Sequence, residues 1–172
     1  VDALLREDEK KDDERFIAIS SVALWDTKLW EDGRFAALAD RIIRELGYRI
    51  VLTGADGKET GRIGAIMSEQ AADLGGKTSL RDLACVYKRA ELLVSTDSGP
   101  MHLAAAVGTP VVALFGPTDA NRTGPYGEGH TVITKSLPCR PCFSKKCETN
   151  VCMREISVND VFEAVKEKVY GL

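Results

Sequence analysis

The segment Ser95–His102, which reads Ser-Thr-Asp-Ser-Gly-Pro-Met-His, holds the residue types best suited to binding a phosphorylated ligand. It follows an apolar run, and Pro100 suits the first turn of a helix because its missing N–H costs no hydrogen bond there. Gly99 leaves the backbone N–H groups of that turn accessible, so the segment predicts a phosphate site at a helix N-terminus. Asp97 lies at its mouth, where a carboxylate accepts hydrogen bonds from sugar or ribose hydroxyls. His102 is close enough in sequence to hydrogen-bond a phosphate.

The same segment also fits a purely structural role. Asp97 and Ser98 are typical helix-capping residues, and His102 would then be an ordinary half-buried histidine. The local pattern is compatible with both interpretations.

Two further loops carry polar residues directly after apolar runs. Lys28 lies between two tryptophans, Trp25 and Trp30, and offers a point charge to a diphosphate. Thr118 and Arg122 follow another apolar run and are candidate contacts for a phosphate or a sugar. The alternatives are a solvated lysine, tryptophans that only pack, and a plain structural turn.

Two familiar phosphate motifs are absent. The segment Leu52–Glu59 contains Gly57-Lys58 but lacks the leading glycine and the trailing serine or threonine of a P-loop. No Gly-x-Gly-x-x-Gly follows the first apolar run. Both absences disfavour a kinase-like NTPase and a standard dinucleotide dehydrogenase.

Four cysteines, Cys139, Cys142, Cys147 and Cys152, form a cluster with the spacing Cys-x2-Cys-x4-Cys-x4-Cys. Four thiolates suffice for a structural zinc site, and the tight spacing also suits an iron–sulfur cluster or two disulfides. The remaining alternative is a set of reduced cysteines that packs a loop onto the fold. The loop is locally basic, which suits an anionic partner or a membrane surface as well as simple exposure; its cations are Arg140, Lys145, Lys146 and Arg154.

Alternating apolar runs and helical patterns must position these loops. Strands are expected at 16–19, 48–53, 91–95, 111–115 and 131–134. Helices are expected at 31–46, at 58–71, from a capping box at Ser79, at 100–107 and from a cap at Ser157. Strands that are apolar on both faces and alternate with helices predict an α/β fold with a doubly wound, mostly parallel sheet and helices on both faces. Such sheets bind ligands outside the carboxyl ends of their strands.

The composition sets the outer bounds. The chain has 172 residues and a formal net charge of −3, from 23 Lys plus Arg and 26 Asp plus Glu. This balance argues against a nucleic-acid partner, and no apolar run is long enough to span a bilayer. A cytoplasmic location is therefore expected. Residues 1–15 carry eleven charges and predict a solvated linker or helix, followed by one domain over 16–172.

The segment Ser95–Ala106, together with Gly108–Thr118, closely resembles the C-terminal half of the lipopolysaccharide heptosyltransferases, which form glycosyltransferase family nine. The resemblance continues into the cysteine-rich loop and extends over nearly all of the chain after Phe16. It is carried further by the segments Trp25–Trp30, Arg34–Ala39, Gly76–Leu80, Pro138–Cys142 and Cys152–Arg154. It implies the two-domain GT-B architecture, in which a Rossmann-like C-terminal domain binds the nucleotide-sugar donor.

The resemblance also implies residue roles. Lys28 would contact the diphosphate and stabilise the leaving group, and Asp97 would hold the heptose hydroxyls. Asp56 would bind the ribose or adenine side, and Thr78 would line the adenine pocket; these two roles come from the resemblance alone. Three residues at the start of the expected helix would surround the phosphates, namely Ser98, Gly99 and His102.

The implied reaction is an inverting transfer from ADP-heptose to the lipopolysaccharide core, and it requires no metal or other cofactor. In the family, the acceptor domain and the general base precede the donor domain, whereas only residues 1–15 precede Phe16 here. We therefore expect this chain to bind ADP or ADP-heptose and to transfer nothing alone. The acceptor, and any peripheral contact with the inner membrane, would involve the other domain. The alternatives are a non-catalytic nucleotide-binding or regulatory module and a cysteine-rich metal or redox protein.

Overall fold

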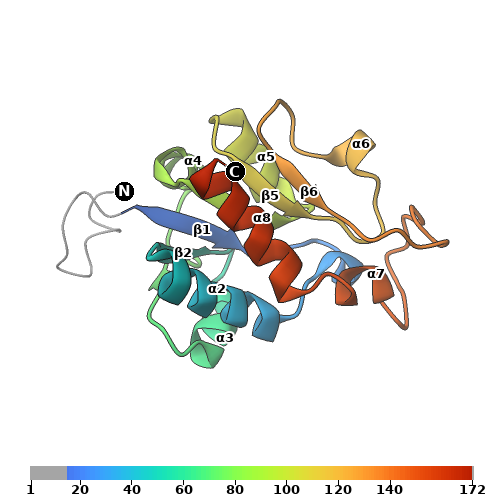
Figure 1. Ribbon diagram of the computed structural model, residues 1–172, viewed down its shortest axis with the longest axis horizontal. Helices are drawn as coiled ribbons and strands as arrows, with labels where there is room; N and C mark the ends of the chain where they lie inside the picture. Colours follow the sequence, from blue (N-terminus) through green and yellow to red (C-terminus); the bar gives the residue numbers. More distant parts are fainter. Residues whose placement is uncertain (1–14, 172) are drawn as a thin grey trace.

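The computed structural model describes residues 15–171, and its centre is a six-stranded parallel sheet (Figure 1). The strands are β1 (Phe16–Ser20), β2 (Arg49–Thr53), β3 (Ala72–Asp73), β4 (Leu92–Thr96), β5 (Val111–Leu114) and β6 (Thr131–Ile133). They lie in the order β3-β2-β1-β4-β5-β6, and each neighbouring pair is parallel. This is the order of a doubly wound, Rossmann-type sheet, so the predicted α/β class is confirmed.

Helices cover both faces of the sheet. They are α2 (Asp32–Leu46), α3 (Lys58–Ile66), α4 (Leu80–Arg89), α5 (Gly99–Ala106), α6 (Ala120–Thr123), α7 (Val151–Arg154) and α8 (Val158–Tyr170), with a 3-10 turn, η1 (Asp26–Lys28). Residues of α2 and α8 belong to one hydrophobic cluster, and residues of α4 and α5 belong to a second one.

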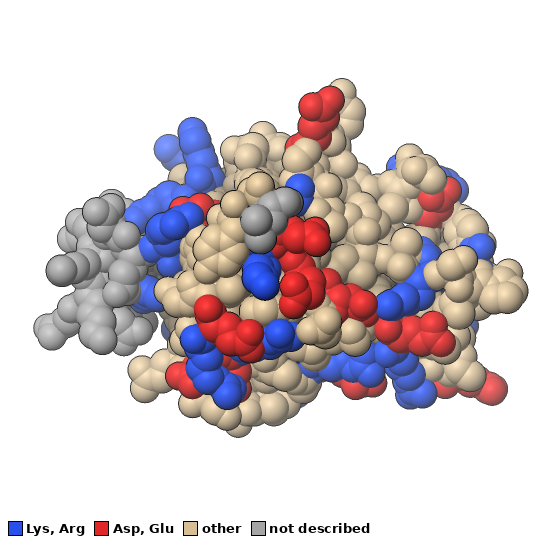
Figure 2. All heavy atoms as spheres, viewed as in Figure 1, with Lys and Arg blue, Asp and Glu red and all other residues tan. Residues whose placement is uncertain are grey.

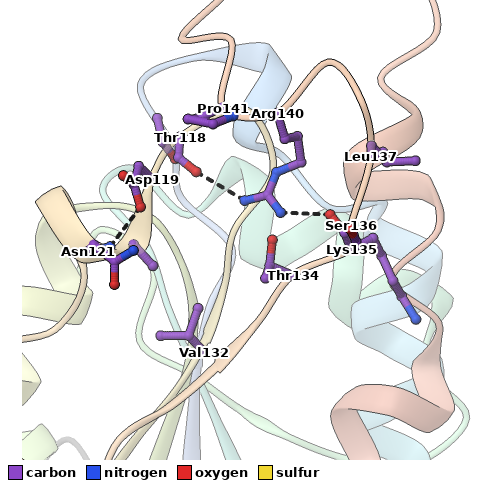
Figure 3. A pocket seen from close by; sticks show the side chains of 11 residues that line it. Thr118, Asp119, Asn121, Val132, Thr134, Lys135, Ser136, Leu137, Arg140 and Pro141 are labelled. Carbon is purple, nitrogen blue, oxygen red and sulfur yellow. Dashed lines mark hydrogen bonds between the residues drawn. The ribbon is translucent and has the colours of Figure 1, made fainter.

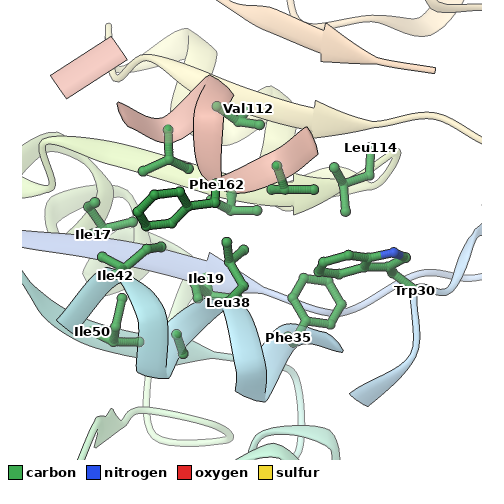
Figure 4. Close-up of a cluster of buried hydrophobic side chains, with 14 of the residues drawn as sticks. Ile17, Ile19, Trp30, Phe35, Leu38, Ile42, Ile50, Val112, Leu114 and Phe162 are labelled. Atoms are coloured by element: carbon green, nitrogen blue, oxygen red, sulfur yellow. The ribbon is translucent and has the colours of Figure 1, made fainter. Parts of the chain in front are cut away.

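Alternate residues of each central strand face these two clusters. In β1, Ile17 and Ile19 pack under α2 and α8, whereas Ala18 between them packs on the side of α4 and α5. Figure 4 shows the first cluster, in which α2 and α8 meet over the strands; it includes Ile17, Ile19, Phe35, Leu38, Ile42 and Phe162. This two-sided burial explains why the strands are apolar throughout rather than alternating.

The expected helix starts are present. Ser79 and Ser157 each form a capping box, with Asp82 and Asp160 respectively at the third helical position. Gly47 ends α2 in the left-handed conformation, with φ of 71°. The short helix α5 begins at Gly99, with Ser98 at the N-cap position.

The expected helix over 58–71 was too long. It ends at Ile66, because the buried carboxylate of Asp40 accepts the backbone N–H groups of Ser68 and Glu69 at 2.9–3.1 Å. These bonds satisfy the two amides outside the helix and direct the chain into β3. This two-residue strand was not predicted, because no apolar run marks it in the sequence.

The charged N-terminal segment was predicted over residues 1–15. Of these, only Arg15 is among the described residues. Arg15 pairs with Glu91 at 3.0 Å on the surface. Figure 2 shows acidic and basic side chains interspersed over the face that it presents. Within residues 15–171, no helix is long and apolar enough to cross a membrane.

Candidate functional site

Three loops meet where the strand order reverses. The chain leaves β1 toward one side of the sheet and β4 toward the other, and doubly wound sheets bind their ligands in the crevice between two such carboxyl ends. Thr96, the last residue of β4, fastens the two loops together by donating to the carbonyl oxygen of Val22 at 2.8 Å. The hydroxyl of Ser21 is buried directly after β1 and has no hydrogen-bond partner among the described residues.

The carboxylate of Asp97 is the centre of this crevice. Its Oδ2 atom lies 2.6 Å from Nζ of Lys28 and accepts a hydrogen bond from Oγ1 of Thr118, also at 2.6 Å. The three residues come from the loops after β4, β1 and β5. The structure therefore brings together three of the predicted site residues.

Burial makes these contacts necessary. The side chain of Asp97 is only 5% exposed and that of Lys28 only 14% exposed. A charge removed from water is costly unless it is paired, and here each charge compensates the other. The second carboxylate oxygen, Oδ1, has no hydrogen-bond partner among residues 15–171. One acceptor thus remains for a ligand.

The two tryptophans beside Lys28 have different roles. Nζ of Lys28 lies over the ring of Trp25, 4.4 Å from its centroid, so the two side chains form a cation–π contact. Trp30 is buried and donates its indole N–H to the carbonyl oxygen of Ile156 at 2.9 Å. The packing interpretation is therefore right for Trp30, whereas Trp25 belongs to the site.

The N-terminus of α5 is open. Ser98 occupies the N-cap position but makes no side-chain capping bond; its hydroxyl donates to the carbonyl oxygen of Thr96 instead. A Cβ atom added at Gly99 would have no heavy atom within 4 Å. The space beside Gly99 is therefore open, and the first-turn N–H groups of a helix are the groups that bind a phosphate. His102 is exposed rather than half-buried.

A second group of predicted residues lies beside β2. Asp56 is exposed, and its carboxylate accepts the backbone N–H of Lys58 at 2.9 Å. The backbone N–H of Gly76 donates to the carbonyl oxygen of Gly54, which brings the loops after β2 and β3 together. Thr78 is half-buried in the second of these loops. The structure thus places Asp56 and Thr78 on neighbouring loops at the carboxyl ends of the strands. Their roles in binding a nucleotide stay predictions.

Arg140, which the sequence indicated only as one of the cations of the cysteine-rich loop, has a structural role beside the site. Its guanidinium donates to the carbonyl oxygens of Thr118 at 3.0 Å and of Lys135 at 2.8 Å (Figure 3). It also donates to the carbonyl oxygen of Gly116. It forms one wall of a hollow of about 720 Å³ beside Thr118. No local sequence motif predicts this role, because all three acceptors are backbone atoms in other segments.

Two other residues of the loop after β5 make contacts within the protein. Asp119 caps α6 by accepting the backbone N–H of Asn121 at 2.9 Å. The guanidinium of Arg122, predicted as a candidate ligand contact, lies over the ring of Phe143 at 5.4 Å. The hydroxyl of Thr118 is directed to Asp97, so its observed contact is with the carboxylate.

The four clustered cysteines do not fit the zinc prediction. Within residues 15–171, no group of three or more His, Cys, Asp or Glu side chains is placed to hold a metal ion. All four are free thiols, and only Cys152 is buried. Burial raises the pKa of Cys152, whereas a hydrogen bond from the backbone of Asn150 lowers the pKa of the exposed Cys147.

The cysteine-rich loop instead packs against the loops that follow β1 and β5. Thr27 donates to the carbonyl oxygen of Ser144 at 2.8 Å, and the amides of Cys142 and Phe143 donate to that of Pro117. Met153 fills the space over Gly116, where an added Cβ would lie 2.6 Å from its sulfur. The interpretation as a packing loop accounts for these contacts.

The sequence and the fold are similar to those of known proteins. The model of glycosyltransferase family 9 (heptosyltransferase) matches residues 2–152. Lipopolysaccharide heptosyltransferase 1 of Pseudomonas aeruginosa is 37% identical over 125 residues, which are 72% of this chain and 35% of that protein. The chain spans between a third and a half of the length of the curated relatives it matches first.

Two solved structures share the fold of this chain. A glycosyl transferase family 9 protein from Veillonella parvula superposes with a TM-score of 0.83 at 26% identity, over 99% of this chain and 51% of that one. The E. coli heptosyltransferase WaaC, solved with ADP, superposes with a TM-score of 0.72 at 24% identity. That match covers 92% of this chain and 46% of WaaC, and it shows a common fold.

Proposed function

The chain belongs to glycosyltransferase family 9, the heptosyltransferases, and we propose that it forms the donor-binding half of an enzyme that transfers heptose from ADP-heptose to the lipopolysaccharide inner core. The observation that carries this proposal is the crevice beside Asp97. It combines a cation, an open helix N-terminus and an unpaired carboxylate oxygen. These are the groups that a diphosphate and a sugar require.

Each group has a separate task in the proposed reaction. Lys28 and the first-turn amides of α5 bind the diphosphate, and Oδ1 of Asp97 accepts hydrogen bonds from the sugar hydroxyls. An acceptor hydroxyl attacks the anomeric carbon and inverts it as the bond to the diphosphate breaks. The electron pair of that bond moves onto the departing ADP, whose charge Lys28 and the helix N-terminus stabilise.

The proton of the acceptor hydroxyl needs a base, which we place in the half of the relatives that this chain does not span. The same half would hold the lipid-linked acceptor, at the cytoplasmic face of the inner membrane. Two solved forms of WaaC support the choice of donor, because one contains ADP and the other ADP-2-deoxy-2-fluoro heptose. The transfer step, as proposed, needs no metal ion.

Calorimetric titration of the full chain with ADP and with ADP-heptose tests the proposal. Both should bind, with ADP-heptose the tighter ligand. Lys28→Ala should weaken both by about ten- to a hundredfold, because it removes a charge-assisted contact worth about 1.5–3 kcal/mol. Lys88→Ala is the matched control, since Lys88 is exposed near the end of α4, at the amino ends of the strands and away from the site.

Four results would count against the proposal. If neither nucleotide binds at millimolar concentration, the crevice is not a donor site. Equal effects of Lys28→Ala and Lys88→Ala would remove the proposed role of Lys28. Equal affinities for ADP and ADP-heptose would point to a nucleotide-binding module without a sugar site. Transfer to a lipid acceptor by this chain alone would contradict its assignment as a donor half.

A further inference from the structure

The contacts of Asp97 divide its two oxygens between different tasks. Both protein partners of the carboxylate, Nζ of Lys28 and Oγ1 of Thr118, lie 2.6 Å from the same atom, Oδ2. No group among the described residues donates to Oδ1. A carboxylate with one partner can rotate about its Cβ–Cγ bond, whereas two partners on Oδ2 from two different loops fix the plane in which Oδ1 lies.

Thr118 is well suited to impose this orientation. Its side chain is buried, with 2% of the residue exposed, so it presents little surface to a ligand. A threonine hydroxyl has one proton to donate, and here that proton is directed to Asp97. Lys28 differs, because its long side chain must also serve a diphosphate under the proposed function. Thr118 is therefore the partner that can keep its contact with Asp97 when a ligand arrives.

The backbone around Thr118 is held by the cysteine-rich loop. Three consecutive carbonyl oxygens, those of Gly116, Pro117 and Thr118, all accept hydrogen bonds from residues 140–143. The donors are the guanidinium of Arg140 and the amides of Cys142 and Phe143. A segment bonded at three successive positions cannot shift without breaking several of these bonds. The backbone that carries the hydroxyl of Thr118 is therefore held in place.

We propose that Thr118 is a positioning residue for sugar recognition, which orients the Asp97 carboxylate so that Oδ1 meets the hydroxyls of the donor sugar. The inference rests on the proposed function, because it assumes that the ligand beside Asp97 is a nucleotide sugar. It adds that Thr118 contributes to binding of the sugar and not to binding of the nucleotide. Thr118 acts through Asp97 and does not touch the sugar itself.

The test compares two substitutions with two ligands on the full chain. Thr118→Val keeps the shape of the side chain and removes the hydroxyl, whereas Thr118→Ser keeps the hydroxyl. By calorimetry, Thr118→Val should weaken ADP-heptose about tenfold and change ADP by less than about twofold. Thr118→Ser should restore ADP-heptose affinity to within about threefold of the parent chain. Circular dichroism melting of each variant verifies that it is folded.

A double-mutant cycle separates positioning from general damage to the fold. In an Asp97→Ala background, Thr118→Val should cause no further loss of ADP-heptose affinity, because the carboxylate that it orients is absent. A merely structural role would weaken ADP and ADP-heptose alike, and Thr118→Ser would then rescue both or neither.

The outcomes distinguish this inference from the function on which it rests. If the parent chain binds ADP-heptose more tightly than ADP but Thr118→Val leaves that preference unchanged, the inference is wrong and the proposed function stands. A parent chain without preference for the sugar overturns the inference and also counts against the proposed function. A parent chain that binds neither nucleotide overturns both.

Discussion

Replacing Asp97 by asparagine should strengthen the binding of ADP while reducing the preference for ADP-heptose. Asparagine has nearly the same shape and still offers an oxygen to Thr118, so the substitution changes mainly charge. In the structure, Lys28 is paired with Asp97 at 2.6 Å. A diphosphate that binds Lys28 must share this cation with a carboxylate of its own sign. Removing the carboxylate charge removes that competition.

The geometry gives the expected magnitude. An ammonium in contact with both a carboxylate and a phosphate holds the two anions about 5 Å apart, where they repel by about 3 kcal/mol at an effective dielectric constant of about 20. Screening at physiological salt leaves about half of this energy, which corresponds to about tenfold tighter binding of ADP. ADP-heptose gains less, because each hydroxyl then meets a neutral acceptor, and a neutral hydrogen bond is weaker by about 1 kcal/mol.

Calorimetry with both ligands measures the two effects, and Asp119→Asn is the matched control. Asp119 lies at the same sheet edge and caps α6, a role that asparagine also fills, so this variant should change neither affinity. The reasoning about competition is refuted if Asp97→Asn weakens ADP as Lys28→Ala does. In that case the carboxylate would support the phosphate site rather than compete with it. An unchanged preference for ADP-heptose would remove the sugar contact from Asp97.

Three further substitutions and one chemical modification test other parts of the protein. Gly99→Ala should leave the melting temperature unchanged or slightly raised, because its methyl group enters open space, and should weaken ADP in calorimetry; a lower melting temperature with intact affinity would contradict this. Gly75→Ala should lower the free energy of unfolding in urea by about 1–3 kcal/mol, because its Cβ would lie 2.1 Å from a threonine hydroxyl and 2.6 Å from a backbone carbon. Gly64→Ala, with nothing within 4 Å in α3, should raise it by about 0.5–1 kcal/mol. As pH rises from 6 to 9, iodoacetamide should modify Cys147 first and Cys152 last, because a backbone hydrogen bond lowers the pKa of Cys147 and burial raises that of Cys152; mass spectrometry of digests would reveal the opposite order.

The features that could be predicted from the sequence are those specified within a few neighbouring residues. Capping boxes at Ser79 and Ser157 lie within four residues, and the strands follow from short apolar runs. The shortened α3 could not be predicted, because the carboxylate that receives the amides after it belongs to Asp40, 28 residues earlier. The same holds for Arg140, whose acceptors are backbone oxygens up to 24 residues away.

The candidate site divides along the same line. The segment Ser95–His102 predicts an anion site by itself, since its glycine and proline have local meanings. The pairing of Asp97 with Lys28 and Thr118 depends instead on which strands are neighbours, and β1 lies next to β4 only after the sheet has formed. The sequence therefore indicates these residues as candidates, but it does not predict that one oxygen atom of Asp97 accepts from both Lys28 and Thr118.

A comparison of three helices in this chain favours a ligand at α5 over a capping role for its first residues. The helices α4, α8 and α5 all begin after a serine. Ser79 and Ser157 accept a first-turn amide of their own helix, whereas Ser98 turns its hydroxyl to the carbonyl oxygen of Thr96. A capping bond of this kind stabilises a helix by about 1 kcal/mol, and α5 lacks it although the residue type is present. Amides left without a protein partner at the edge of a crevice, beside a buried cation and an unpaired carboxylate oxygen, are what a bound diphosphate would use.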